Sequence, residues 1–198
     1  MKISKIIFAL AIIIAGASSV IAQSKIKFNS GLYLTANDFQ QQKLTYEIDC
    51  SNASDKIKVN NFLGSSTGYV LAKGEKHSFD KKNVYGYRDC KNKAFRFYNG
   101  NEYQIIDTAG FYMYYQYMPE EINKGKAPVK KDEYFFSKNA DGNLELLTMD
   151  NLKKAFPYNN NFHYALDANF KADKDLLVYD TFQKNYKVKY LFSQSLNK

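Results

Sequence analysis

Between residues 84 and 117, hydrophobic and polar residues alternate in four short runs, and a turn signal separates each run from the next. The runs cover residues 84–88, 94–98, 102–107 and 111–117. Alternation with a period of two is typical of strands, and short polar or glycine-containing connections are typical of hairpins. The sequence therefore predicts an antiparallel β-meander in the middle of the chain.

The loop lengths within this meander decide which side chains share a face. A two-residue loop at Asn99-Gly100 would place Phe97 opposite Glu102, whereas a three-residue loop at 99–101 places it opposite Tyr103. The second pairing separates polar from apolar partners, so three-residue loops are predicted at 99–101 and 108–110. The predicted core face carries Phe95, Phe97, Tyr103, Ile105, Phe111, Met113, Tyr115 and Tyr117. The predicted reverse face carries Arg96, Tyr98, Glu102, Gln104, Ile106, Tyr112, Tyr114 and Gln116.

The flanking segments predict further strands and then helices. Strands are expected at 31–34, 44–49, 57–59, 69–72, 76–79, 133–136 and 144–147, with a helical turn after the capping residue Thr35. Thr148 and Asn161 are predicted to cap helices, and Asp173 is predicted to start a third that runs through Phe182. The stretch from Tyr186 fits either a helix or a strand, and helix is preferred.

Together these elements predict an α+β fold, with an antiparallel β-meander sheet followed by a C-terminal helical region. Residues 23–198 are expected to form a single domain, mainly β over 23–147 and mainly helical over 148–198. The 176 residues that follow position 22 are enough for one domain with a substantial core.

The first 22 residues predict an export signal. Lys2 and Lys5 precede an apolar run, and small residues close the segment before Gln23. This arrangement is typical of a secretory signal peptide. No later apolar stretch has the roughly 20 residues that a membrane-spanning helix needs, so no transmembrane anchor is expected in the mature chain. The mature protein is predicted to be soluble and either secreted or periplasmic.

The net charge of the chain says little about the kind of partner that the protein binds. Without the leader, the formal charge falls from +8 to +6, and the lysines are spread along the chain. Nucleic-acid binders concentrate positive charge on one face, so nucleic acid is not expected as a partner. An envelope glycan, a peptide or another protein is the expected kind of partner.

Cys50 and Cys90 are the two cysteines of the chain, and in an exported protein they are expected to form a disulfide. Two unlinked thiols are the alternative, because sequence does not fix the distance between them. A thiol-redox site is not indicated, since no Cys-x-x-Cys pair is present.

Motifs for catalysis or metal binding are absent from the sequence. His77 and His163 lie in no recognised catalytic pattern, and the segment around Asn139, Asp141 and Gly142 lacks the glutamate that closes a calcium loop. The sequence therefore predicts neither a metal nor a cofactor, and it favours a protein that is not an enzyme.

The aromatic content is the strongest functional signal, with 17 tyrosines, 15 phenylalanines and no tryptophan. Tyrosine combines an apolar ring with a hydrogen-bonding tip, as binding surfaces require. A binding or interaction module is therefore the first hypothesis, and its predicted ligand-binding residues are Arg96, Tyr98, Glu102, Gln104, Tyr112, Tyr114 and Gln116. Burial of this face beneath C-terminal helices is the structural alternative. An envelope-associated hydrolase, with His77 or His163 beside a carboxylate, is the alternative function.

Several segments resemble small exported proteins of unknown function from Bacteroidota-type bacteria. The resemblance lies in the Ala-Gln that ends the leader and in the segments 85–89, 95–98 and 102–106. It covers about the middle third of the mature chain and implies export without implying an activity.

Overall fold

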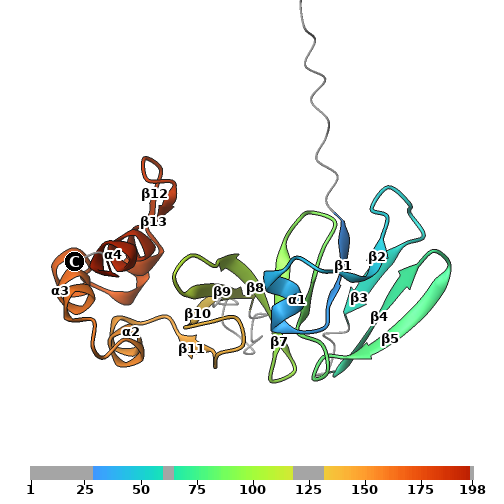
Figure 1. The fold of residues 1–198 in the computed structure, drawn as a ribbon, viewed down its shortest axis with the longest axis horizontal. Helices are drawn as coiled ribbons and strands as arrows, with labels where there is room; N and C mark the ends of the chain where they lie inside the picture. Colours follow the sequence, from blue (N-terminus) through green and yellow to red (C-terminus); the bar gives the residue numbers. More distant parts are fainter. Residues whose placement is uncertain (1–28, 60–64, 118–131, 197–198) are drawn as a thin grey trace, which may run out of the picture.

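The computed structural model describes residues 29–59, 65–117 and 132–196, and its main element is an eight-stranded antiparallel sheet (Figure 1). The strand order across this sheet is β11-β10-β9-β8-β7-β6-β1-β2. The strands are β1 (Ser30–Tyr33), β2 (Thr45–Ile48), β6 (Gly86–Arg88), β7 (Ala94–Tyr98), β8 (Asn101–Asp107), β9 (Tyr112–Gln116), β10 (Glu133–Ser137) and β11 (Glu145–Leu146). The predicted meander is confirmed as β6 to β9.

A smaller sheet and a helical region complete the α+β fold that the sequence predicts. The smaller sheet contains β3 (Lys56–Val59), β4 (Thr67–Ala72) and β5 (Glu75–Asp80). The helical region begins after β11 and lies at the far end of the large sheet from the smaller one (Figure 1). A short helix, α1 (Ala36–Gln40), follows β1, and Thr35 caps it with a capping box, as expected.

The predicted loop between β7 and β8 is wrong by one residue. Phe97 pairs with Glu102 and Arg96 pairs with Tyr103, so the connection is the two-residue turn Asn99-Gly100. Both turn residues have positive φ, 50° and 77°. This is the conformation of a type I′ turn, whose twist matches that of the flanking strands and which asparagine and glycine adopt readily. The preference of Asn99-Gly100 for this turn therefore outweighs the unfavourable pairing of polar with apolar side chains across the two strands.

The next connection also differs from the prediction. Ile105 lies opposite Tyr114 rather than Met113, and the register shifts between Ile105 and Asp107. The shift means that β8 has one extra residue relative to β9 at this point, which is a β-bulge. After it, Asp107 lies opposite Met113.

The observed register assigns the side chains to two faces of the sheet that differ from the predicted pair. What we call the Arg96 face carries Arg96, Tyr98, Tyr103, Ile105, Tyr112, Tyr114 and Gln116; the Phe97 face carries Phe95, Phe97, Glu102, Gln104, Met113 and Tyr115. Glu102 and Gln104 therefore lie on the opposite face from the other five predicted ligand-binding residues. Tyr117, predicted in the core, is 58% exposed.

The Phe97 face is buried at both ends, by different partners. Near the smaller sheet, Phe97 packs with Val70 and Ala72, and its ring centroid lies 5.8 Å from that of Phe79. At the other end, Met113 and Phe136 belong to the cluster formed by the helical region. The C-terminal helices therefore pack against the face that was predicted to be the core. The alternative expectation, that these helices cover the predicted reverse face, is wrong.

Three helices and one 3-10 helix make up the C-terminal region: α2 (Met149–Ala155), α3 (Asn160–Asn169), η2 (Asp173–Leu177) and α4 (Lys187–Leu196). Thr148 caps α2 as expected. Asn159 caps α3 instead of Asn161, since its side chain accepts the hydrogen bond from the Phe162 amide.

The third predicted helix is wrong beyond Leu177. Tyr179 belongs instead to the short hairpin of β12 (Tyr179–Asp180) and β13 (Asn185–Tyr186), and Phe182 at its tip is 89% exposed. In proteins, a helix gains most of its stability from packing of its apolar face. Because Phe182 is not packed against other residues, a helix that runs through it would lack this stabilisation. The preferred helix in the last stretch is confirmed as α4.

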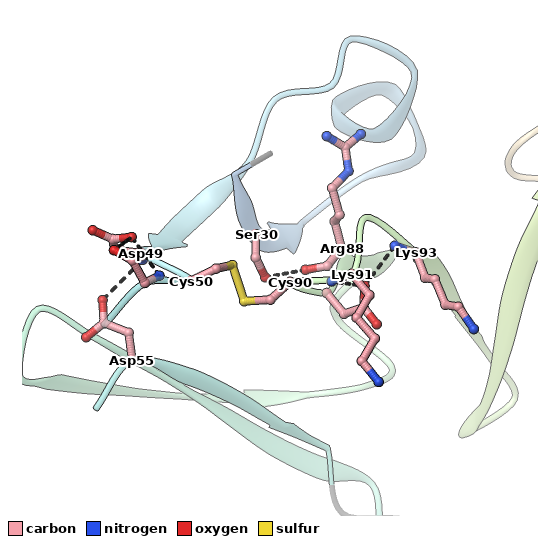
Figure 2. Close-up of a disulfide and its surroundings, with 10 residues drawn as sticks. Ser30, Asp49, Cys50, Asp55, Arg88, Cys90, Lys91 and Lys93 are labelled. Atoms are coloured by element: carbon pink, nitrogen blue, oxygen red, sulfur yellow. Dashed lines mark hydrogen bonds between the residues drawn. A yellow bond between two sulfur atoms is a disulfide. The ribbon is translucent and has the colours of Figure 1, made fainter. Parts of the chain in front are cut away.

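Cys50 and Cys90 form a disulfide, as the sequence predicts, with their Cα atoms 5.5 Å apart (Figure 2). The bridge joins the turn after β2 to the turn after β6. Side chains fix the two turns: Asp55 accepts a hydrogen bond from the Asp49 amide, and Ser30 donates one to the Arg88 carbonyl. The two ends of the bridge are therefore held independently of it.

The predicted signal peptide, residues 1–22, lies outside the described residues. Among the helices that the structure describes, none is long and apolar enough to cross a membrane.

Candidate functional site

A cavity of about 550 Å³ lies beside Arg96. Three segments line it: the start of α1 with the two residues before it, the segment that leads into β6, and the end of β7 with its turn. Asp141, from the connection between β10 and β11, closes the ring of residues. We call this the Arg96 cavity. Its lining residues are Leu34, Thr35, Ala36, Lys81, Lys82, Asn83, Val84, Tyr85, Arg96, Phe97, Tyr98, Asn99, Gly100 and Asp141.

Arg96 is a buried cation surrounded by tyrosine rings. Its exposed fraction is 5%, and its Cζ lies 5.5, 5.2 and 5.7 Å from the ring centroids of Tyr85, Tyr98 and Tyr114. Each such contact stabilises a cation by about 0.5 to 2 kcal/mol, with the larger values where water is excluded. The rings therefore offset part of the desolvation of the guanidinium.

A chain of hydrogen bonds fixes one side of the guanidinium. Arg96 Nη1 donates to the Tyr114 hydroxyl at 3.2 Å, and that hydroxyl lies 2.9 Å from Ser137 Oγ. Ser137 uses its own proton to donate to the Asn139 carbonyl at 2.6 Å, so the Tyr114 hydroxyl must donate to Ser137. The chain has one donor and one acceptor at each step, and it holds Arg96 in one orientation.

The helix α1 adds an aromatic support behind these rings. Phe39 stacks on Tyr85 with 5.4 Å between centroids and lies 6.3 Å from Tyr112. Gln40 donates to the Tyr112 hydroxyl. The cover on this part of the Arg96 face is therefore α1, and the cavity opens at its edge.

The charge around the cavity is positive. Arg96, Lys81 and Lys82 line it together with one carboxylate, that of the exposed Asp141. Lys81 is buried; its burial lowers the pKa of its ammonium, and the nearby Glu102 carboxylate raises it, with a net decrease. Among the described residues, no carboxylate forms an ion pair with Arg96.

The seven predicted ligand-binding residues separate into three groups. Arg96 and Tyr98 line the cavity, and Tyr114 holds Arg96 from behind while being fully buried itself. Tyr112 and Gln116 lie farther along the same face. Glu102 and Gln104 lie on the Phe97 face, where burial and then the Glu102 carboxylate raise the pKa of Tyr87.

Sequence reasoning missed Tyr85, Lys81 and Asp141 as neighbours of Arg96. Tyr85 is close to Arg96 because the Phe97 amide donates to the Tyr85 carbonyl, just before β6 begins. The alternation of residues 84–88 gave no signal for this contact, since Tyr85 lies outside the strand β6.

The two histidines lie away from this cavity. His77 Nε2 is 3.6 Å from a carboxylate oxygen of Glu75, and the ring of Tyr46 stacks on the histidine at 4.1 Å. His163 Nε2 lies 2.9 Å from the Phe156 carbonyl oxygen, a bond that follows from helix packing. Neither histidine lines the Arg96 cavity.

Within residues 29–59, 65–117 and 132–196, no group of three or more His, Cys, Asp or Glu residues is placed to hold a metal ion. A larger cavity of about 640 Å³ lies in the helical region beside Phe156 and Asn159, and its lining contains one charged residue, Lys138. The Arg96 cavity combines a buried charge with aromatic rings.

A scan against protein-family models, a search of curated proteins and a search of solved structures each found no match to this chain.

Proposed function

We propose that this protein is a non-enzymatic binding module that acts outside the cytoplasm and takes its ligand in the Arg96 cavity. The observation that carries the proposal is Arg96 itself, a cation that is 5% exposed, ringed by three tyrosines and bordering a cavity of about 550 Å³. A pocket with aromatic walls and few polar groups in fixed positions is typical of ligand-binding sites.

Binding is tested with the purified mature protein on glycan and peptide arrays. We expect Tyr98→Ala to reduce binding of any ligand that wild type retains, because Tyr98 lines the cavity and contacts Arg96. The matched control is Tyr164→Ala, which removes a 74% exposed tyrosine from α3. Equal loss in both variants, or loss in the control alone, would place the binding surface elsewhere.

The export part of the proposal is supported by the leader pattern of residues 1–22 and by the disulfide between Cys50 and Cys90. Disulfides persist in oxidising compartments and are rare in the cytosol. The test is fractionation of cells that express the full chain, followed by N-terminal sequencing. We expect mature protein outside the cytoplasm beginning near Gln23; cytosolic protein that retains Met1 would contradict export.

Hydrolysis is the second candidate, and the pairing of His77 with Glu75 favours it. A histidine oriented by a carboxylate can act as a general base when a substrate lies within reach. Glu75 has a side chain that is 80% exposed, however, so bulk water weakens its interaction with the imidazole. Hydrolytic activity towards an envelope polymer that His77→Ala abolishes would favour this candidate over the binding module.

A further inference from the structure

Two hydrogen-bond donors beside the Arg96 cavity are buried without an acceptor. They are Nε of Arg96 and the hydroxyl of Tyr85, and neither has a hydrogen-bond partner among the described residues. Burial and the neighbouring Tyr114 raise the pKa of Tyr85, so its hydroxyl is protonated at neutral pH and acts as a donor. A buried donor without an acceptor is unfavourable, so native proteins rarely keep two of them at one cavity without a reason.

The free side of the guanidinium has a specific geometry. Nη1 is engaged with Tyr114, and Nε, which shares the other edge of the guanidinium with Nη2, is buried without a partner. These two nitrogens donate in parallel, and their spacing matches the two oxygens of a carboxylate. The ring of Tyr85 lies 5.5 Å from Arg96 Cζ, and its hydroxyl is a further buried donor of the cavity lining.

The charge balance indicates what is missing at this edge. A buried arginine is normally paired with a carboxylate of the same protein. Arg96 has no such partner among the described residues, and Lys82 adds positive charge to the cavity lining. Asp141, the one acidic residue of that lining, is exposed to water. The site is therefore complementary to an anionic ligand.

The strand pairing around Arg96 favours a sugar over an extended peptide. Peptides that bind to sheets add a strand at an unpaired edge. Both edges of β7 are already paired, one with β6 and the other with β8. The lining offers side-chain amides at Asn83 and Asn99 instead, which suit hydroxyl groups, and tyrosine rings suit the face of a sugar ring.

We propose that the Arg96 cavity binds the carboxylate of an acidic sugar, with the Nε–Nη2 edge of Arg96 and the Tyr85 hydroxyl as its donors. This inference rests on the proposed binding function and names its ligand class. The ring of Tyr98 covers the guanidinium, and one hydrogen bond of 3.3 Å to Asn143 holds its hydroxyl. The ligand reaches the buried edge when this ring rotates away, a side-chain motion that needs no change in the sheet.

The experiment measures binding of glucuronic acid and glucose to the full mature protein by NMR titration and calorimetry. We expect glucuronic acid to bind at least roughly tenfold more tightly than glucose, since a hydrogen bond to a charged group contributes about 1.5 to 3 kcal/mol. Arg96→Lys keeps the positive charge but removes the two-donor edge. We expect this variant to bind glucuronic acid roughly tenfold more weakly than wild type.

Tyr85→Phe is the sharper variant, because it removes one oxygen atom from a group that has no partner in the unliganded protein. We expect severalfold weaker binding of glucuronic acid with no loss of thermal stability. Tyr112→Phe is the matched control, since Tyr112 lies on the same face but outside the cavity lining. It should bind glucuronic acid as wild type does.

Three outcomes overturn the inference, and they separate it from the proposed function. Equal binding of glucose and glucuronic acid, with loss in Tyr98→Ala, leaves a binding module whose ligand is neutral. Tighter binding of a glutamate-terminated peptide, or of phosphate or sulfate, than of glucuronic acid replaces the acidic sugar with another anion. Absence of binding by every probe, together with failure of the array screen, removes the proposed function as well.

Discussion

Lys189 Nζ lies 3.0 Å from Asp107 Oδ1, and the lysine side chain has no exposure to solvent. The same ammonium donates to the carbonyl oxygens of Ala109 and Phe111 and lies 4.0 Å from the ring centroid of Phe111. Lys189 belongs to α4, and its partners belong to the end of β8 and to the connection between β8 and β9. This ion pair therefore joins the C-terminal helix to the central meander across about 80 residues of sequence.

We expect Lys189→Ala to lower the free energy of unfolding by about 3 to 5 kcal/mol, because it leaves the Asp107 carboxylate and two carbonyl groups without their buried donor. Urea unfolding followed by circular dichroism measures the change. Lys154→Ala is the control, since it removes an exposed lysine from α2 and should shift stability by no more than about 0.5 kcal/mol. Similar losses in both variants would contradict a buried role for Lys189.

Stability should rise with pH above neutrality because of this lysine. Burial lowers the pKa of Lys189 from 10.5 to about 8, although Asp107 opposes the decrease. Between pH 8 and 10, the unfolded chain therefore keeps a proton that the folded chain has lost. The free energy of unfolding then increases with pH, by about 1.4 kcal/mol per unit at most.

Above about pH 10 the trend should reverse. Burial raises the pKa of Tyr85 and Tyr87, so both stay neutral in the folded protein while they ionise in the unfolded chain. Urea unfolding at half-unit steps from pH 7 to 11 measures the curve, and Lys189→Met should remove its rising limb while keeping its fall. A rising limb that persists in Lys189→Met would assign it to other groups.

The disulfide should contribute about 3 to 4 kcal/mol, since it closes a loop whose ends are 40 residues apart. Replacing both Cys50 and Cys90 with serine should lower the midpoint of urea unfolding accordingly, with little change in the folded circular dichroism spectrum. The folded spectrum should survive because separate hydrogen bonds hold the two turns (Figure 2). Unchanged stability in the double variant would contradict this prediction, because it would mean that loss of the disulfide does not increase the conformational entropy of the unfolded chain.

Tyr114→Phe should destabilise the protein, whereas Tyr85→Phe should not. The Tyr114 hydroxyl accepts from Arg96 and donates to Ser137 in a buried position, so its loss costs about 1 to 3 kcal/mol. The Tyr85 hydroxyl has no partner to lose. Thermal unfolding of both variants gives the comparison, and equal destabilisation would disprove the difference between the two hydroxyls.

The two-residue turn between β7 and β8 can be tested directly. Gly100 has a φ of 77°, a region in which a residue with a side chain costs about 1 to 2 kcal/mol. Gly100→Ala should therefore lower stability by about that amount, and Asn99→Gly should leave it almost unchanged. A three-residue loop would place the left-handed residue at Asn101 and would make Asn101→Gly the neutral change.

The sequence was sufficient for features that depend on neighbouring residues. Period-two alternation located the four strands of the meander, and Thr35 and Thr148 marked the starts of α1 and α2. The even number of cysteines, Cys50 and Cys90, in a chain for which export is predicted was sufficient to predict the disulfide. Each of these predictions uses local geometry or a simple chemical condition.

The sequence was insufficient to decide which residues gather around Arg96. Aromatic residues occupy both faces of the meander, so hydrophobicity alone does not distinguish one register from the register shifted by one residue. The conformation of Asn99-Gly100 and the bulge after Ile105 decide it, and they place Glu102 and Gln104 opposite Arg96.

Local sequence pattern and long-range packing therefore determine different features of this protein. The pattern of residues determined that this protein has a β-meander and a helical C-terminal region, and the tertiary structure brings Cys50 and Cys90 within bonding distance. Only the tertiary structure decided that Tyr85, Tyr98 and Tyr114 surround Arg96 and that no carboxylate of the described chain reaches it. The physical reason is that a one-residue change in strand register moves every side chain of a strand to the other face, while it leaves the local pattern unchanged.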